Sequence, residues 1–192
     1  MIVFEGCRNT GKTFLSELVS MSLDIPRFQY DFIGVYKSFE IIDHDPVSQH
    51  DFSVGKETMI MQLNKENLLP ANMIHDRGFL TVLSWGISQK RISKEEAINQ
   101  LLYLKESGLL KRIKVIYIEG KNPSTSTRVK DIWDETERNN LEKEAYDFII
   151  EKLEEICLDV TDFSIYRFKN NFDEHSSKTI LQYVRNIISQ NQ

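Results

Sequence analysis

The chain has 192 residues, 41% of them apolar, which suits one compact domain with a continuous core. Its net charge of -5 lacks the basic excess of a protein that coats nucleic acid, so long polyanions are not expected as general partners. Only Cys7 and Cys157 are present, too few for a disulfide framework or a zinc site.

The amino-terminal residues MIVFEG contain neither the positively charged segment nor the cleavage site of a secretory signal. No apolar run in the sequence approaches the ~18 residues that a membrane span needs. We therefore expect a cytoplasmic protein that has no membrane partner and keeps both cysteines as reduced thiols.

Short apolar runs alternate with helical patterns, and no repeat or linker separates them. Runs typical of buried strands lie at residues 2–5, 72–75, 113–119 and 163–168, with a weaker one at 27–32. Helical patterns lie at residues 12–22, 56–69, 79–88, 93–107, 135–156 and 174–189. The alternation predicts an α/β fold of three layers, a five-stranded parallel sheet flanked by helices, in one domain over residues 1–192.

Two of these helical patterns carry further information. Ser93 followed by Glu96 has the spacing of a capping box and marks a helix start, and Gly108 marks its end. The helix at 79–88 is apolar nearly all round, so it is either deeply buried or shared across a dimer interface.

Residues 6–13, GCRNTGKT, match the phosphate-binding pattern G-x-x-x-x-G-K-[ST] between a strand and a helix. In such a P-loop, backbone N–H groups surround the phosphates, the lysine reaches the β- and γ-phosphates, and the next hydroxyl binds Mg²⁺. We therefore expect ATP and Mg²⁺ as ligands, with Lys12 catalytic and Thr13 on the metal. The expected nucleotide-binding residues of this loop are Gly6, Arg8, Asn9, Thr10, Gly11, Lys12, Thr13 and Phe14.

A second motif, NMIHDRG, ends the apolar run at 72–75. Because strand ends of a parallel sheet meet at the ligand crevice, Asp76 would orient a magnesium-bound water or a nucleophile there, and Arg77 would bind an acceptor phosphate. The alternative is an ion pair at a surface turn. His75 is more typical of a packed or hydrogen-bonded residue than of a catalyst.

A polar segment after the run at 113–119 leads into a long helix, and we interpret residues 121–140 as a small lid. Its cations would offset negative charge on a migrating phosphoryl group. Arg128 is the first catalytic candidate and Arg138 the second. For either residue the alternative is a solvated helix face.

Two further segments offer weaker candidates. Asn170, in the loop after the last strand, suits a position beside a purine, although loop polarity alone explains it equally well. Residues 28–60 combine aromatic residues with acids, as does a site that stacks a base and hydrogen-bonds a sugar. We interpret Asp31 and Phe39 there as candidate substrate contacts.

The order of these motifs resembles the thymidylate kinase and deoxynucleoside kinase group of P-loop kinases over most of the chain. FEG with GKT resembles that group's first strand and loop, IHDRGFLTVLSWG its Asp-Arg segment, VIYIEGKNPSTSTRVK its lid entry and LEKEAYDFI its post-lid helix. The resemblance implies the P-loop kinase fold, Mg²⁺-dependent transfer of the γ-phosphoryl group of ATP to a nucleotide or nucleoside, foremost a deoxynucleoside monophosphate, and a homodimer. By resemblance Arg77 binds the acceptor and Arg128 approaches the transferred group.

The sequence also departs from that group. Arg8 stands where thymidylate kinases usually carry Asp, Gly78 stands where Tyr, His or Ser is general, and no clear Arg-Glu-Pro motif follows the second strand. Thymidine specificity therefore does not follow. A kinase of nucleic-acid 5′ ends and a non-catalytic nucleotide-binding module stay open as alternatives.

Overall fold

The computed structural model describes residues 1–7, 10–29, 46–70, 72–120 and 135–190, without the side chains of 46–48 and 135–139. Five strands form one sheet in the order β2-β3-β1-β4-β5, and all four neighbouring pairs are parallel. The predicted five-stranded parallel sheet is confirmed. Its strands are β1 (Ile2–Glu5), β2 (Arg27–Gln29), β3 (Ile74–Asp76), β4 (Lys114–Glu119) and β5 (Ser164–Lys169).

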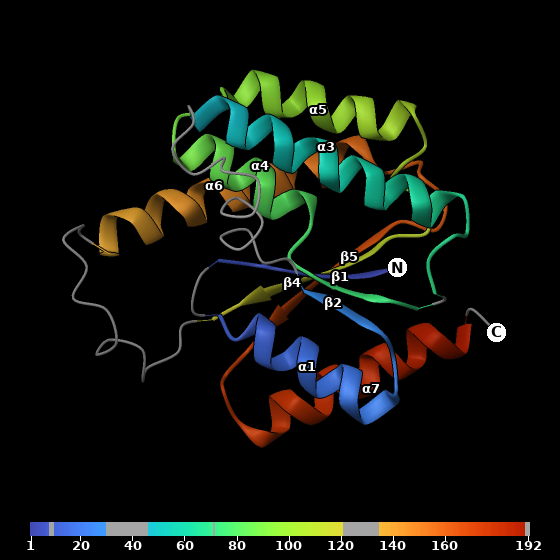
Figure 1. Ribbon diagram of the computed structural model, residues 1–192. Helices are drawn as coiled ribbons and strands as arrows, with labels where there is room; N and C mark the ends of the chain where they lie inside the picture. The colour runs from blue at the N-terminus through green and yellow to red at the C-terminus, as the bar shows by residue number, and fades with distance from the viewer. Residues whose placement is uncertain (8–9, 30–45, 71, 121–134, 191–192) are drawn as a thin grey trace.

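Helices cover both faces of this sheet and complete the three layers (Figure 1). One face carries α1 (Lys12–Leu23) and α7 (Glu174–Gln190), which lie side by side. The other layer consists of α3 (Pro46–Lys65), α4 (Phe79–Ser88), α5 (Lys94–Glu106) and α6 (Glu135–Ile156). None of the helices in the described part of the chain is both long and apolar enough to cross a membrane.

Alternate residues of β1 serve the two layers, because successive side chains of a strand point to opposite faces. Ile2 and Phe4 join the apolar cluster beneath α1 and α7, whereas Val3 joins the cluster beneath α4, α5 and α6. Every residue of β1 is buried. This central strand therefore anchors both halves of the core.

The helix at 79–88 is found as α4, and its apolar character is explained within one chain. Phe79, Leu80, Val82 and Leu83 are at most 4% exposed, and α4 packs mainly on α6 and α3. Of the two alternatives for this helix, burial is the one that the fold shows.

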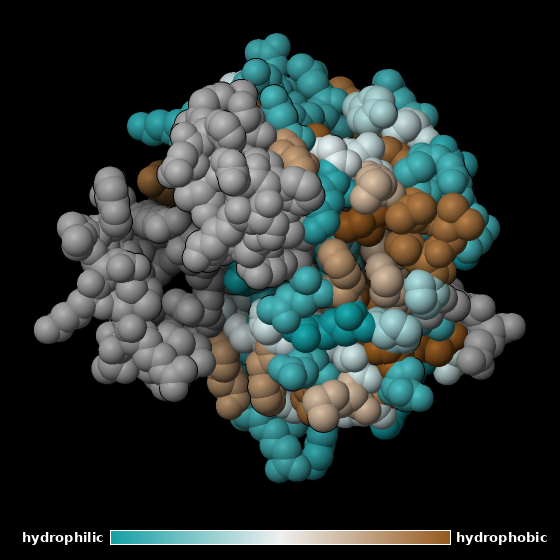
Figure 2. Space-filling view, in the orientation of Figure 1, coloured by the Kyte–Doolittle hydropathy of each residue, from teal (hydrophilic) through white to brown (hydrophobic). Residues whose placement is uncertain are grey.

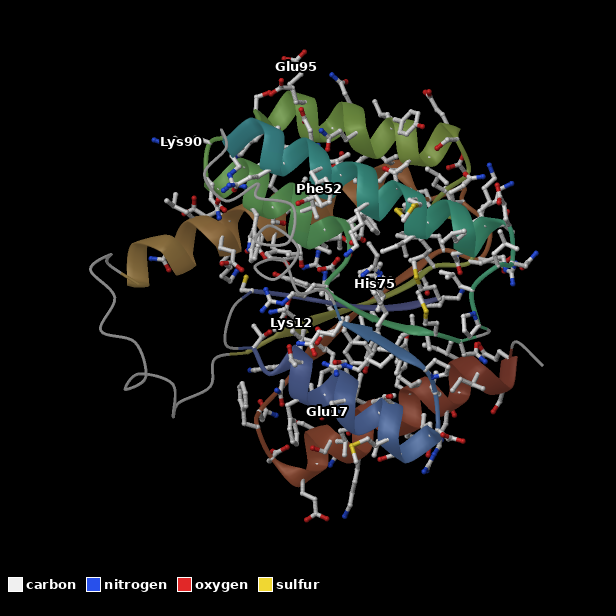
Figure 3. All side chains as sticks on the ribbon, in the orientation of Figure 1. Lys12, Glu17, Phe52, His75, Lys90 and Glu95 are labelled. Carbon is white, nitrogen blue, oxygen red and sulfur yellow. The ribbon has the colours of Figure 1, made fainter. Side chains whose placement is uncertain are left out.

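The helix α5 begins with the expected capping box, in which Ser93 Oγ accepts from the Glu96 N–H (3.1 Å) and Glu96 Oε2 accepts from the Ser93 N–H (2.7 Å). Ala97, Leu101 and Leu104 point into the core. Its outer side, along the top of the view, is hydrophilic (Figure 2), and Glu95 points away from the molecule there (Figure 3). This is the amphipathic pattern of a surface helix.

The helix α3 differs from the prediction, since it begins at Pro46 instead of residue 56 and ends at Lys65 instead of residue 69. Proline at the first helical position costs no hydrogen bond, because that N–H has no helical partner. The first half of α3 buries the polar His50 and Ser53. An apolar periodicity therefore could not report it.

The arrangement of β1 and β3 places two loops next to each other. These strands are hydrogen-bonded neighbours with Phe4 opposite Asp76, so the loop after β1 and the turn after β3 leave the same edge of the sheet side by side. In open α/β sheets ligands bind at this carboxyl edge.

Candidate functional site

The loop after β1 lies close to neighbouring segments at its two glycines, to backbone at Gly6 and to a side chain at Gly11. Gly6 has a φ of 145°, and a Cβ there would lie 2.4 Å from the carbonyl oxygen of Ile118. Gly11 has a φ of 82°, and a Cβ there would lie 2.6 Å from Asn170 Nδ2. Only glycine fits both conditions, a left-handed conformation and a contact too close for a side chain. The glycine spacing of the motif is therefore a requirement of this fold.

Lys12 begins α1 and is 3% exposed. Its Nζ donates a hydrogen bond to the carbonyl oxygen of Cys7 at 2.7 Å, and Figure 3 shows it where α1 meets the sheet. Burial, and then the nearby cation of Arg77, lowers the pKa of Lys12 to about 8. Three buried acids, Glu142, Asp76 and Glu5, offset only part of this effect, so the ammonium group lacks full compensation by negative charge. Phosphate oxygens would supply it.

The loop after β5 holds the P-loop from the other side. Asn170 is 4% exposed, and its Nδ2 donates to the carbonyl oxygen of Thr10 at 2.9 Å, while its Oδ1 accepts from the Phe172 N–H at 2.9 Å. Both ends of the amide are thus bonded to backbone of the protein. The structure brings Asn170 to the P-loop, and its contact with a nucleotide stays a prediction.

Asp76 is the last residue of β3 and is fully buried. Its Oδ2 accepts from Arg27 Nη2 at 2.8 Å, and Arg27 also donates from Nε to Ser16 Oγ of α1 at 2.9 Å. The other carboxylate oxygen, Oδ1, has no hydrogen-bond partner among the described residues. Asp76 is therefore not part of a surface ion pair, and one buried oxygen stays available for a further ligand.

The pairing with Arg27 was missed by the sequence analysis, because a base in a weak strand has no local pattern that names its partner. Arg27 opens β2, and the register of β2 and β3 places it opposite Ile74, two residues before Asp76 in β3. A long side chain covers that distance.

Arg77 has a φ of 71°, a conformation that a residue with a Cβ rarely adopts. Its N–H donates to the carbonyl oxygen of Phe4 in β1 at 3.0 Å, which fixes the turn to the neighbouring strand. The guanidinium carbon lies 5.8 Å from the centroid of the Trp85 ring. The half-buried cation thus lies above α4 and near enough to Lys12 to affect its pKa.

Two more buried acids lie around this site. Glu142 of α6 is 3% exposed, and its charge raises the pKa of Lys12, against the effect of burial. Glu57 of α3 is 3% exposed, and burial, followed by the charge of Glu5, raises its pKa well above the ordinary value. Neither acid was predicted as a site residue, because a single acid within a helix has no local pattern that marks it as buried beside a site.

His75 lies within β3 beneath α3 (Figure 3) and is fully buried. Its ring packs edge-to-face on Phe28, with 5.2 Å between centroids, and its Nε2 lies 3.6 Å from Glu57 Oε1. Burial lowers the pKa of His75 to about 4. The imidazole is therefore neutral near pH 7 and is a packed residue.

Replacing Glu57 by glutamine is expected to raise the stability of the fold, and to raise it more at higher pH. Above the ordinary pKa near 4.5, the unfolded chain releases a proton that the folded chain retains, so Glu57 costs stability as pH rises. Glutamine has no proton to release. Thermal unfolding at about pH 5 and about pH 8 should show a gain in Tm that grows with pH, at about 2–4 °C for each kcal/mol.

Glu17→Gln serves as the matched control, since Glu17 is exposed on α1 (Figure 3). This control should leave Tm nearly unchanged at both pH values. An equal change in Tm for Glu57→Gln at the two pH values would contradict a protonated Glu57.

The other candidates differ in what the structure says of them. Thr13 is half-buried in the first turn of α1, directly after Lys12, whereas Phe14 is 63% exposed. Arg138 lies in α6, but its side chain is not described. Five candidates and most of the lid lie outside the described residues: Arg8, Asn9, Asp31, Phe39, Arg128 and the segment 121–134.

The described residues contain no group of three or more His, Cys, Asp and Glu side chains that could form a metal centre from protein alone. A magnesium ion at a P-loop needs fewer protein ligands, because phosphate oxygens and water complete its shell. The hydroxyl of Thr13 and the unpartnered Oδ1 of Asp76 fit such a site.

No protein-family model matches the sequence, and no curated protein shows a significant match. Solved structures do match. Deoxyadenosine kinase from M. mycoides, with dCMP and a flexible dCDP bound, has a TM-score of 0.56 at 16% identity, over 100% of this chain and 99% of that chain. The same kinase with bound dATP has a TM-score of 0.52 at 18% identity, over 98% of each chain.

Thymidylate kinase from Candida albicans has a TM-score of 0.57 at 13% identity, over 99% of this chain and 91% of that chain. Identities this low establish the fold and leave the reaction open. The predicted fold and the structural likeness to this group are confirmed. The chain has the α/β fold of the P-loop nucleoside and nucleotide kinases, as a divergent example of it.

Proposed function

We propose that this protein is a kinase that transfers the γ-phosphoryl group of ATP to a nucleotide or nucleoside, with a deoxynucleoside monophosphate as the leading acceptor. One observation carries the proposal. Two cations lie at the same edge of the sheet: Lys12 in the P-loop after β1, and Arg77 after β3, whose N–H donates to Phe4 of β1 at 3.0 Å. Such a pair suits two phosphate-bearing substrates that must meet.

The residues divide between the two substrates. The triphosphate of ATP would lie on the N–H groups of the P-loop and of the first turn of α1, with Lys12 on its β- and γ-phosphates. Thr13 would hold Mg²⁺ and Asp76 would orient a water on it through Oδ1; the ion neutralises phosphate charge. Arg77 would bind the acceptor phosphate as a two-pronged donor.

The remaining parts of the site belong mostly to segments outside the described residues, apart from the start of α6, which contains Arg138. We propose that residues 121–140 form the lid of a single kinase domain and bring Arg128 and Arg138 over the transferred group. Asp31 and Phe39 would contact the sugar and base of the acceptor. The neighbours that were solved with deoxynucleotides support this class of substrate.

ADP release in the presence of ATP, Mg²⁺ and a panel of acceptors tests the proposal. The panel contains nucleosides, deoxynucleoside monophosphates and 5′-hydroxyl oligonucleotides. We expect ADP release that depends on a deoxynucleoside monophosphate. Dependence on the oligonucleotide alone would identify a 5′-end kinase, and binding of ATP without turnover on any acceptor would identify a non-catalytic module; either result overturns the proposal.

At high pH, Lys12 is expected to take up a proton when ATP binds. The pKa of Lys12 is about 8 in the free protein, and a bound triphosphate favours the charged lysine and raises that pKa. Affinity should therefore fall as pH rises through 8, by about tenfold between pH 7 and pH 9. Isothermal titration at about pH 9 in two buffers of different ionisation enthalpy counts the protons taken up.

Lys12→Arg is the control for this titration, because arginine keeps its proton at every pH used. This variant should show no proton uptake, whatever its affinity. Identical heats for the unmodified protein in both buffers would contradict a lowered pKa for Lys12.

A further inference from the structure

A buried carboxylate at the end of β1 joins three elements around the site. Glu5 is fully buried, and its Oε1 accepts from the N–H groups of Gly78 (2.9 Å) and Leu80 (3.1 Å) at the start of α4. Its Oε2 accepts from the hydroxyl of Thr81 at 2.6 Å. The hydroxyl of Tyr146 in α6 lies 2.6 Å from that of Thr81 and 3.4 Å from Oε2.

The direction of these bonds follows from the number of protons. Thr81 has one hydroxyl proton and donates it to Glu5, so Tyr146 must be the donor in the short bond to Thr81. The result is a chain of bonds from α6 through α4 to β1. All three side chains that form it are buried.

Glu5 also acts as the cap of α4. The residue at the cap position is Gly78, which has no side chain to accept from the first N–H groups of the helix. The carboxylate of Glu5 takes that place, and a negative charge is favourable at a helix N-terminus. Burial raises the pKa of Glu5 above its ordinary value, and the bonds from Thr81 and Gly78, which favour the ionised form, offset part of that rise.

Gly78 lets the start of α4 come close to this carboxylate. A Cβ on Gly78 would lie 2.8 Å from Val3 Cγ1 and 3.1 Å from Glu5 Oε1. A larger residue would therefore push the start of α4 away from the carboxylate. The glycine permits the close approach that the cap needs.

The residues next to this network are those of the two substrate sites. Gly6 of the P-loop follows Glu5 in the chain, and Arg77 precedes Gly78. We propose that Glu5 is a positioning residue which, with Thr81 and Tyr146, fixes Arg77 relative to the P-loop and to α6. The inference rests on the proposed function, in which Arg77 binds the acceptor and α6 follows the lid.

Tyr146→Phe tests the network, because it removes one hydroxyl from α6 and changes no residue of β1, α4 or the P-loop. Loss of that donor should loosen the start of α4, and displacements of about 1 Å in a site of this kind have large kinetic effects. We expect the KM of the acceptor to rise about tenfold, while the Kd of ATP changes by less than about twofold. Glu5→Gln should raise the KM of the acceptor in the same way.

Ser84→Ala is the matched control for the kinetics. Ser84 is buried in α4 one turn beyond Thr81, and its hydroxyl has no partner among the described residues. Its loss should leave the KM of the acceptor unchanged. If Tyr146→Phe lowers Tm but leaves the KM of the acceptor at the level of this control, the hydroxyl is merely structural and the proposal is overturned.

A second measurement needs no turnover. Trp85, whose ring lies near the Arg77 guanidinium, belongs to a different apolar cluster from Tyr146. In a Trp133→Phe background Trp85 is the sole tryptophan, so its fluorescence reports on Arg77. Tyr146→Phe should shift the emission in the direction of Arg77→Ala.

The two measurements separate the two ideas. Failure of every acceptor to raise ADP release would overturn the proposed kinase, and the emission of Trp85 would then decide the network alone. An emission unchanged by Tyr146→Phe, in a background where Arg77→Ala shifts it, would overturn the positioning role even in an active kinase.

Discussion

Replacing Lys12 by alanine is expected to lower kcat by about a thousandfold or more, since charge stabilisation on the transferred phosphoryl group is the main contribution of such a site. Lys12 is 3% exposed and bonded to the loop carbonyl of Cys7, so its charge is held in one place within the loop. The Kd of ATP should rise as well, because the same lysine contacts the β- and γ-phosphates before the transfer. Initial rates of ADP release at saturating acceptor measure the effect.

Lys178→Ala is the control for a general effect of charge. Lys178 is an exposed lysine of α7 that pairs with Glu174 at 2.7 Å, and exposed pairs of this kind contribute little. Its removal should leave kcat within about twofold of the unmodified protein. Retention of most activity by Lys12→Ala would contradict the role of the P-loop as the ATP site.

The sequence was informative wherever one local pattern decides a structure. The glycine spacing of residues 6–13 predicted the loop because each glycine meets a neighbouring backbone or side chain that tolerates no Cβ. Ser93 and Glu96 predicted a helix start because both partners of a capping box lie within one turn. Short apolar runs predicted β1, β3 and β4, because buried parallel strands are apolar on both faces. The less buried β5 was predicted as well, whereas β2 had only a weaker signal.

The rest of the site depends on partners that are distant in the chain. Asp76 accepts a hydrogen bond from Arg27 of the neighbouring strand β2. Glu5 accepts from Thr81 and Tyr146, which come within reach only when α4 and α6 pack on the sheet. The hydrophobic periodicity of a sequence does not predict such pairings. Glu5 could be noticed as a charged residue in an otherwise apolar strand, and a buried charge demands partners, but the pattern does not say which.

Replacing Arg77 by alanine is expected to lower kcat/KM for the acceptor by about a hundredfold, because a two-pronged donor to the acceptor phosphate is lost. The Kd of ATP should stay within about threefold at neutral pH. Arg167→Ala is the control, since Arg167 is a half-exposed arginine of β5 that pairs with Glu154 at 3.0 Å. Steady-state kinetics with each substrate varied in turn separate the two effects.

The affinity for ATP at high pH gives a second test of Arg77→Ala, because the proposal predicts the direction in which this affinity changes. The cation of Arg77 lowers the pKa of Lys12 in the free protein, so its removal lets Lys12 keep its proton to higher pH. At about pH 9 Arg77→Ala should therefore bind ATP at least as tightly as the unmodified protein, while its use of the acceptor is damaged. Weaker ATP binding at that pH, to the extent seen for Lys12→Ala, would place Arg77 on the ATP side of the site and reverse the division of substrates between the two cations.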